Sequence, residues 1–251
     1  MDFQVLISTQ NPDPNAFRKS DFNKLIISQN PSGVGLDEDK LKFISVDEAG
    51  LSKSRNRALQ ECEATFALIA DDDLEYCQDF EDKVAAGFRQ FPDADILTFK
   101  IISPEGKPYK NYKESAFEHS RTSIYKVSSV EMVFRMSSIK AKGLRFDERF
   151  GLGSEFKSGE ETIFLNDALN AGLNLYYIPE YLVIHPIESS GKLLDQNFFY
   201  SKGALIKRLY GGSFKLILGL LFLVKQVTKP QNKLTLTASI QAIKKGYYSI
   251  K

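Results

Sequence analysis

The sequence contains few residues of the types that build disulfide frameworks and zinc sites. Among its 251 residues there are two cysteines and two histidines. A zinc site needs more ligands than these readily supply, and Cys62 and Cys77 fall within an ordinary pattern of strands and helices. We therefore expect both cysteines to be reduced packing residues, with neither a disulfide nor a metal between them.

Neither charge nor hydrophobicity is concentrated enough to indicate a nucleic-acid-binding or membrane-spanning protein. Lys and Arg total 33 and Asp and Glu total 32, so no overall basic field favours nucleic acid. The apolar run Leu216–Val224 would extend about 13 Å as a helix, well short of the roughly 20 residues that cross a bilayer. The chain begins MDFQVLIST, without a basic stretch or a cleavage site, which predicts no signal peptide and a cytoplasmic location.

The pattern of apolar residues divides the chain into a large α/β part and a helical tail. Strand-like runs alternate with amphipathic segments, which predicts a mainly parallel sheet with right-handed crossovers. The expected strands are residues 3–8, 25–28, 41–46, 65–70, 95–102, 123–135, 175–178 and 182–185. The expected helices are one capped by Ser52, residues 80–91, residues 137–142, one that begins near Gly159, and three segments within 196–251. The polar segment 103–120 is expected to form a lid or an acceptor-facing loop.

Three consecutive aspartates, Asp71, Asp72 and Asp73, end the strand predicted at residues 65–70. Three carboxylates at one strand end repel one another unless a positive group lies among them, and ligands bind at this edge of open α/β sheets. Asp71 and Asp73 can share one divalent cation, and Mg²⁺ or Mn²⁺ held in this way keeps positions open for phosphate oxygens. The alternative is an acidic turn whose side chains cap the next element.

The helix before this strand carries two arginines, Arg55 and Arg57. An arginine near the same sheet edge can hold a diphosphate through the paired N–H groups of its guanidinium. A solvent-exposed helix face is the alternative for both side chains, and it is favoured for Arg57.

Glu160 and Glu161 form a second candidate pair, at the start of the helix predicted near Gly159. A carboxylate beside a cleft can serve as the general base that deprotonates an attacking hydroxyl. Residues 158–161 also match the S-x-x-E capping box, in which Glu161 only stabilises the helix start. If Glu161 caps the helix, Glu160 becomes the candidate base.

The C-terminal part of the sequence offers two weaker signals. His185 follows an apolar run and is either a structural hydrogen-bonding residue or a contact for a phosphate or metal ion. Five basic residues surround the apolar run in the tail: Lys207, Arg208, Lys215, Lys225 and Lys229. This pattern predicts a helix that lies in a membrane interface, and the alternative is a helix packed on the α/β part or on a second copy of the chain.

Four stretches carry a resemblance to a known family: VLISTQN, GLSKSRNRAL, LIADDDLEY and FDERFGLGSEFKSGEETIFLNDALNAG. In order, they resemble the first strand and nucleotide-contacting loop, the Gly-x-Ser-x-x-Arg-Asn helix, the DxD motif, and the acceptor-side loop with its Glu-Asp helix of inverting family 2 glycosyltransferases. The resemblance covers roughly residues 3–190. It departs from the family in two places, because Glu-Glu replaces Glu-Asp and the turn at residues 30–33 replaces an acidic run that contacts the nucleotide base.

The resemblance implies a GT-A fold and a set of site residues. Asp73, with Asp71, would hold the Mn²⁺ or Mg²⁺ that bridges the donor diphosphate. The residues implied at the nucleotide-sugar site are Thr9, Arg55, Asp71 and Asp72. Glu161 falls where the family has its base, but the longer side chain does not settle the choice between Glu160 and Glu161.

The implied organisation is a GT-A domain over residues 1–192 and a helical extension over residues 193–251. The nucleotide-binding half would span residues 1–102 and the acceptor-side half residues 103–192. The implied activity is transfer of a sugar from a nucleoside diphosphate donor, a UDP-sugar, to a hydroxyl of a glycan or lipid-linked acceptor, with inversion. Such enzymes build capsule, exopolysaccharide or lipopolysaccharide at the cytoplasmic face of the inner membrane, which residues 213–229 would contact.

A binding protein of the same fold is the rival interpretation. It would be a non-catalytic sugar-nucleotide-binding or scaffolding subunit of a polysaccharide assembly complex. The aspartates, Arg55 and the glutamate pair count against it, because a chain without catalytic demands need not keep all three. The sequence leaves self-association open.

Overall fold

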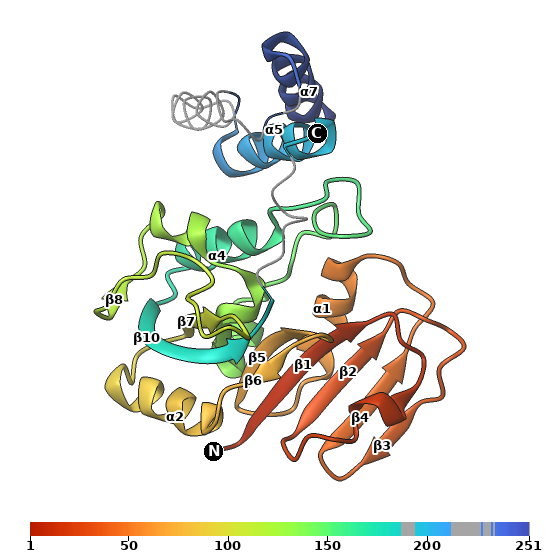
Figure 1. Ribbon diagram of the computed structural model, residues 1–251, viewed down its shortest axis with the longest axis vertical. Coiled ribbons are helices and arrows are strands. Elements are labelled where there is room, and N and C mark those ends of the chain that lie inside the picture. Colours follow the sequence, from red (N-terminus) through yellow and green to blue (C-terminus); the bar gives the residue numbers. More distant parts are fainter. Residues whose placement is uncertain (187–193, 212–226, 228–231, 233, 251) are drawn as a thin grey trace.

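The computed structural model describes residues 1–186, 194–211, 227, 232 and 234–250, and a single sheet forms its centre (Figure 1). The ten strands have the order β3-β4-β2-β1-β5-β9-β7-β10-β6, with β8 paired to β10. They are β1 (Phe3–Thr9), β2 (Lys24–Ser28), β3 (Leu36–Glu38), β4 (Leu41–Ser45), β5 (Phe66–Asp71), β6 (Glu75–Tyr76), β7 (Ile96–Ile102), β8 (Phe117–Glu118), β9 (Met132–Arg135) and β10 (Leu175–Ile184). The α-helices are α1 (Leu51–Glu61), α2 (Phe80–Gln90), α3 (Met136–Ala141), α4 (Glu160–Asn170), α5 (Gln196–Tyr210) and α7 (Leu236–Ser249), and the 3₁₀-helices are η1 (Pro14–Phe17), η2 (Ser123–Lys126) and η3 (Ser129–Glu131).

The sheet is mostly parallel, as expected, but one antiparallel strand divides it. The pairs β4–β2, β2–β1, β1–β5 and β7–β10 are parallel, whereas β9 pairs antiparallel with both β5 and β7. Because β9 runs antiparallel to both β5 and β7, β7 points the same way as β5. Strand β10, which is parallel to β7, does so too. The C-terminal ends of these strands therefore share one edge, where ligand sites form in open α/β sheets.

The strand predicted over residues 123–135 is wrong for most of its length. Only β9 is a strand, and η2 and η3 precede it. At η3 the Ser128 hydroxyl and the Glu131 carboxylate form a reciprocal capping box. Serine side chains that bond to nearby backbone compete in this way with strand hydrogen bonding.

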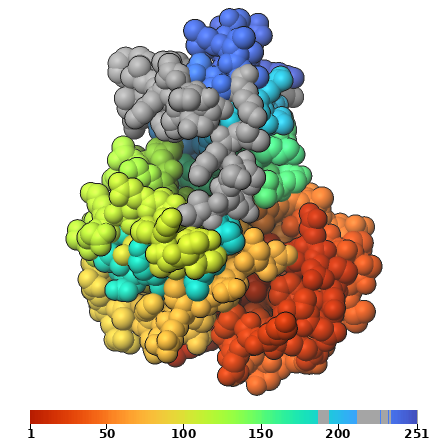
Figure 2. All heavy atoms as spheres, viewed as in Figure 1, coloured from red at the N-terminus to blue at the C-terminus, as the bar shows by residue number. Residues whose placement is uncertain are grey.

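Helices cover both faces of the sheet and close two apolar cores. One core packs Ala58 and Leu59 of α1, Ile139 of α3 and Phe164 of α4 against one face. The other packs α2 against the opposite face through its stripe of Phe80, Val84 and Phe88. Figure 2 shows the N-terminal strands and α1 (red and orange) beside the residues that follow them (yellow and green), with the C-terminal helices (blue) above.

Two predicted helix caps are wrong. Gly50, and not Ser52, occupies the N-cap of α1, and the Ser52 hydroxyl donates to the Phe150 carbonyl at 2.6 Å. Gly159, and not Ser158, occupies the N-cap of α4, so the predicted capping box does not form. Both glycines have positive φ, 124° and 112°, a backbone conformation that serine rarely adopts.

The two short strands predicted between residues 175 and 185 are one strand, β10. Its pairing with β7 shifts register between Tyr177 and Tyr181 and again before Val183. Pro179 lies inside the shifted segment and has no backbone N–H to donate to a neighbouring strand. This explains why the pairing of β10 with β7 is interrupted there.

Two of the helical segments expected in the tail are α5 and α7, which cross at very short distance. A Cβ atom added to Gly203 would lie 2.1 Å from the carbonyl oxygen of Ile243, and one added to Gly246 would lie 1.9 Å from that of Tyr200. Only glycine permits this approach. The predicted membrane-contacting stretch 213–229 lies outside the described residues, apart from Val227.

The described part of the chain contains both cysteines and helices whose length and polarity can be compared with a bilayer. Cys62 and Cys77 are both free thiols, and Cys62 is fully buried. Within the described ranges, every helix is too short or too polar to cross a bilayer.

Candidate active site

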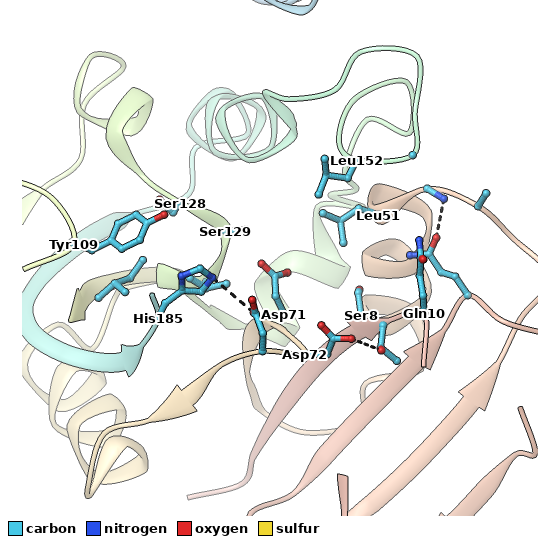
Figure 3. Close-up of a pocket in the computed structure, with 18 residues that line it drawn as sticks. Ser8, Gln10, Leu51, Asp71, Asp72, Tyr109, Ser128, Ser129, Leu152 and His185 are labelled. Carbon is cyan, nitrogen blue, oxygen red and sulfur yellow. Dashed lines mark hydrogen bonds and ion pairs between the residues drawn. The ribbon is translucent and has the colours of Figure 1, made fainter. Parts of the chain in front are cut away.

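A cavity of about 610 Å³ opens where β1 and β5 end (Figure 3). Figure 3 shows Asp71 and Asp72 between His185 on one side and Ser8 and Gln10 on the other. The lining residues include Thr9, Asp71, Asp72, Asp73 and His185, all of which the sequence had nominated. Arg55, Glu160 and Glu161 are not among the described residues that line it.

Each of the three aspartates has a different partner. The Thr9 hydroxyl donates to Asp72, so the end of β1 is tied to the end of β5. Asp71 accepts from Arg55 at 3.1 Å. Asp73, whose side chain is 55% exposed, has its Oδ1 3.7 Å from His185 Nε2. The carboxylate repulsion inferred from the sequence is therefore reduced by a positive group at Asp71 and by a hydrogen-bond donor at Asp72, whereas Asp73 faces the imidazole of His185.

Arg55 is buried behind the cavity, which neither alternative from the sequence anticipated. It is 1% exposed, and its Nη1 donates to Glu160 Oε1 at 3.1 Å while Nη2 donates to Asp71 at 3.1 Å and to Ser129 at 2.8 Å. Arg55 thus joins the aspartate edge to the glutamate pair. Arg57, in contrast, lies on the exposed helix face and pairs with Glu61, as favoured from the sequence.

The two glutamates of α4 have distinct surroundings. Glu160 is buried and bonded to Arg55, and within the described residues its Oε2 has no hydrogen-bond partner. Burial and the adjacent Glu160 carboxylate raise the pKa of Glu161 above its usual value near 4.5, whereas the positive charges of Lys202 and Arg55 lower it. A carboxylate with a raised pKa is the stronger proton acceptor, which favours Glu161 over Glu160 as a base.

Asp73 and His185 together fit a divalent cation. His185 Nδ1 donates to the Pro186 carbonyl at 2.7 Å, so in the neutral imidazole the lone pair is on Nε2, the nitrogen that lies 3.7 Å from Asp73 Oδ1. Carboxylate oxygen and imidazole nitrogen both suit Mn²⁺. Within the described ranges, no group of three or more acidic, histidine or cysteine side chains is placed to hold a metal by itself. A bound ion would therefore take further ligands from a molecule that occupies the cavity.

Several residues that shape the site are not among those nominated from the sequence. Gln29, at the end of β2, accepts from the Gly50 amide at 2.8 Å and so fixes the start of α1 beside the cavity. The Tyr109 ring, from the segment expected to be a lid, meets the His185 ring edge to face at 5.7 Å between centroids. Gly153 approaches Gly50 so closely that a Cβ would lie 3.1 Å from the Gly50 Cα.

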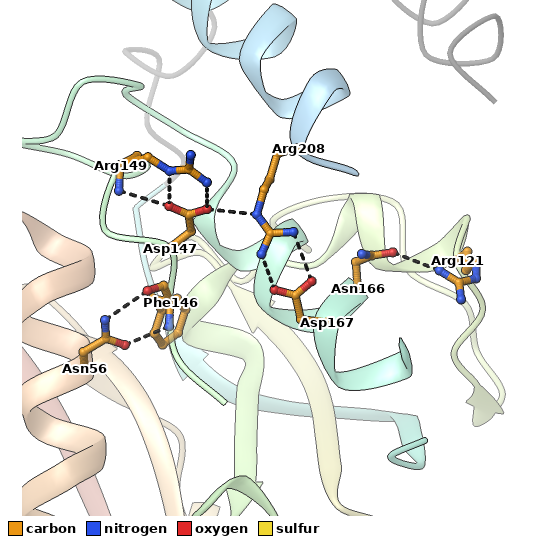
Figure 4. Close-up of polar contacts among 8 residues, drawn as sticks. All are labelled: Asn56, Arg121, Phe146, Asp147, Arg149, Asn166, Asp167 and Arg208. Atoms are coloured by element: carbon orange, nitrogen blue, oxygen red, sulfur yellow. Dashed lines mark hydrogen bonds and ion pairs between the residues drawn. The ribbon is translucent and has the colours of Figure 1, made fainter. Parts of the chain in front are cut away.

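Asn56 is a further missed residue, although the motif that contains Arg55 also contains it. Its amide donates to the Phe146 carbonyl at 3.0 Å, and its oxygen accepts from the Phe146 amide at 2.7 Å (Figure 4). The two neighbouring side chains therefore have different structural roles. Arg55 contacts the charged centre, and Asn56 holds the loop that leads to α4.

The similarity to known proteins supports the fold of this chain and does not establish an activity. No protein-family model and no curated protein sequence matches the chain. Among solved structures, residues 1–349 of S. aureus TarS align over 97% of this chain and 81% of that one, with 19% identity and a TM-score of 0.65. The same fragment in complex with UDP-GlcNAc aligns over 96% and 79%, with 19% identity and a TM-score of 0.66. The chain thus has the α/β GT-A fold expected from its sequence, and at this identity the likeness establishes only the fold.

Proposed function

We propose that this protein is a glycosyltransferase that uses a nucleoside diphosphate sugar, most simply a UDP-sugar. The observation that carries the proposal is the cavity in which Thr9 and three aspartates meet at the strand ends of a GT-A fold. TarS, which shares this fold, has been crystallised with UDP and with UDP-GlcNAc. The non-catalytic binding subunit remains the alternative function.

The donor would bind with its nucleotide along the ends of β1 and β5 and its diphosphate at the aspartates. Thr9 and Asp72 are bonded to each other and line the cavity, which supports their assignment to the nucleoside. Asp73 with His185, and Asp71 beside them, would hold Mn²⁺ or Mg²⁺. When bound, the ion would neutralise the charge that develops on the departing diphosphate.

Glu161 is the proposed base. The acceptor hydroxyl attacks the anomeric carbon from the side opposite the diphosphate, and its proton passes to the Glu161 carboxylate as the carbon–oxygen bond forms. The bond from the anomeric carbon to the diphosphate breaks at the same time, UDP leaves, and the configuration inverts. Arg55 pairs with Glu160 next to this base, and the charge of Glu160 raises the pKa of Glu161.

The direct test is calorimetric titration of UDP with and without Mn²⁺, on the wild type and on Asp73→Ala. We expect metal-dependent binding that Asp73→Ala abolishes. Glu75→Ala is a matched control, because it removes a carboxylate two residues away that does not line the cavity. Failure of UDP, GDP and dTDP to bind with either metal would reject the proposal.

Turnover separates the enzyme from its rivals. A transferase releases UDP from a UDP-sugar when an acceptor is present. A nucleotidyltransferase of related fold would release pyrophosphate, and a binding subunit would hold the donor without releasing either product. Donor binding without UDP release across a panel of glycan and lipid-linked acceptors would favour the binding subunit.

We also propose that the tail contacts the cytoplasmic face of a membrane, where a lipid-linked acceptor would lie. The outer face of α7 exposes three large side chains at four- and eight-residue spacings: Leu236 at 60%, Ile240 at 41% and Tyr248 at 79%. Lys244 lies on the same face, and apolar, aromatic and basic groups together suit an anionic interface. Vesicles of phosphatidylglycerol should bind the full chain, and Ile240→Gln/Lys244→Gln should weaken this binding. Equal affinity of the two proteins would reject contact through α7.

A further inference from the structure

Helix α5 packs directly on the start of α4, where the candidate base lies. The Lys157 amide donates to the Ser201 hydroxyl at 2.8 Å. Leu205 fills the space beside Gly159, where an added Cβ would lie 3.1 Å from its methyl group. The apolar cluster behind these contacts joins Phe150, Phe156 and Ile163 to Ala204, Leu205 and Ile250. The C-terminal segment is therefore fitted to the loop and helix that carry the glutamates.

Arg208, one turn further along α5, forms hydrogen bonds with two residues of the region around the glutamates (Figure 4). Its Nε donates to Asp147 at 2.9 Å, and its Nη2 and Nη1 donate to the two oxygens of Asp167 at 2.6 and 3.3 Å. Asp147 precedes Glu160 and Glu161 in the chain, and Asp167 follows them on α4. A single guanidinium thus holds both sides of the segment that presents the glutamates.

The charge distribution of the sequence agrees with this docking. Residues 196–251 contain ten of the 33 basic residues and none of the 32 acidic ones. The remaining 195 residues therefore carry a net negative charge, and the tail complements it. Two carboxylates of the α/β part, Asp147 and Asp167, take up part of this complementary charge through Arg208.

Lys202 lies on α5 between the two residues that contact the start of α4, Ser201 and Leu205. Its ammonium lies over the Phe198 ring, 5.5 Å from the centroid, and its positive charge acts on Glu161 and Glu160 from beyond ion-pair distance. The charged groups that act on Glu161 are therefore Glu160 from its own helix, Lys202 from α5 and Arg55 from α1. Of these three, only Lys202 comes from the C-terminal segment.

We infer that α5 is part of the candidate catalytic centre, with Arg208 and Lys202 as positioning residues for Glu161. Arg208 fixes the position of the Glu161 side chain, and Lys202 supplies positive charge that favours the ionised form of the Glu161 carboxyl group. This inference rests on the proposed role of Glu161, and it gives a chemical task to a helix that the sequence had placed only within a helical extension.

The test compares full-length Lys202→Met, Lys202→Arg and Lys207→Met with the wild type. Lys207 lies on the same helix with its ammonium over the Tyr247 ring, so its removal is a matched loss of charge away from the glutamates. The first readout is the titration of the Glu161 carboxyl by NMR on ¹³C-labelled glutamate, assigned with Glu161→Gln. The second is the pH dependence of turnover.

Lys202→Met should raise the pKa of Glu161 by about one unit, which corresponds to about tenfold slower turnover below that pKa. Lys202→Arg should restore both values, Lys207→Met should leave both unchanged, and UDP affinity should stay the same in all four proteins. A Glu161 titration in Lys202→Met that coincides with the wild type would overturn the inference. The NMR readout needs no turnover, so the inference can fail while the transferase proposal stands, and the reverse.

Arg208→Met gives an independent variant. We expect turnover to fall at least tenfold with unchanged UDP affinity, because the donor edge is built by other elements. Arg208→Lys should recover only part of the loss, since lysine cannot bond both oxygens of Asp167 while it reaches Asp147. Wild-type turnover in a folded Arg208→Met protein would remove Arg208 from the proposal.

Discussion

The donor edge and the acceptor-side centre hold their carboxylates in opposite ways. The donor edge comprises Asp71, Asp72 and Asp73, and it opens onto the cavity with one partner for each carboxylate. The acceptor-side centre comprises the buried Glu160 and the half-buried Glu161, and it is connected to two other elements, α1 through Arg55 and α5 through Lys202. An open site can exchange its partners for a ligand at little cost, whereas a buried charge depends on its partners for stability. Substitutions at the donor edge should therefore affect binding, and those at the acceptor-side centre should affect proton transfer and stability.

The largest effect should come from removing the base. Glu161→Gln should lower turnover about 10³-fold with UDP affinity unchanged, because a positioned base typically contributes 10²- to 10⁴-fold. Glu160→Gln should lower turnover much less and should move the rise of activity to lower pH. The sign follows from the charge: Glu160 raises the pKa of Glu161, so its neutralisation lets Glu161 ionise in more acidic solution. Rate–pH profiles of the three proteins decide the assignment, and a larger loss in Glu160→Gln would reverse it.

The next effect tests the connection between the two regions. Arg55→Met removes a side chain that is bonded to both regions and leaves Glu160 buried without this partner. Breaking a buried ion pair in this way should cost about 3–5 kcal/mol of unfolding free energy, measurable by urea denaturation. Adding Glu160→Gln should recover part of the loss, because the second change removes the unpaired charge. A loss below about 1 kcal/mol would mean that the two regions are not coupled through Arg55.

This difference between the regions also explains what the sequence predicted. The donor edge follows from local pattern, since Asp71–Asp73 come directly after an apolar run and parallel strands end at a common edge. The buried position of Arg55 does not follow, because it depends on Glu160, a residue 105 positions away. The same is true of Lys202, whose functional partner lies on another helix. Periodicity within a short window contains no information about such pairs.

The errors in the fold have a related cause. The predicted caps at Ser52 and Ser158 relied on residue type, but the strained backbone before α1 and α4 selects Gly50 and Gly159. Residues 123–135 were expected to form one strand because their apolar residues are spaced like those of a strand. The capping box formed by Ser128 and Glu131 instead starts a 3₁₀-helix, so the strand begins only at Met132.

A smaller effect should come from the crossing of α5 and α7. Gly246→Ala would place a Cβ 1.9 Å from the Tyr200 carbonyl oxygen, so the helices must separate. We expect a loss of about 3 kcal/mol, at the upper end for overpacking, with faster hydrogen exchange in both helices. Gly35→Ala is the control, because its nearest atom would be 3.7 Å away. UDP affinity should be unchanged, and a parallel loss of UDP binding would contradict the independence of the donor edge.

The smallest expected effect concerns a buried group that neither region uses. His119 is 6% exposed and bonds to Thr98 and Ser123, and burial, with the charge of Lys110, lowers its pKa to about 4. The unfolded chain binds this proton near pH 6.5, so the stabilisation is complete above that value and is lost as the pH falls toward 4. Between pH 7 and pH 5 this single group should remove about 2 kcal/mol of unfolding free energy.

His119→Gln isolates that contribution, because glutamine can keep a hydrogen bond to Thr98 and does not titrate. We expect urea denaturation at pH 7 and pH 5 to show a smaller acid loss in the variant than in the wild type. Glu131 and Glu161 act in the opposite direction, since burial raises both carboxyl pKa values, and the difference between the two proteins cancels their contribution. Equal acid losses would show that the His119 proton is not excluded by burial. The acceptor-side half would then tolerate charge in its interior, and the contrast with the donor edge would rest on the Arg55–Glu160 pair alone.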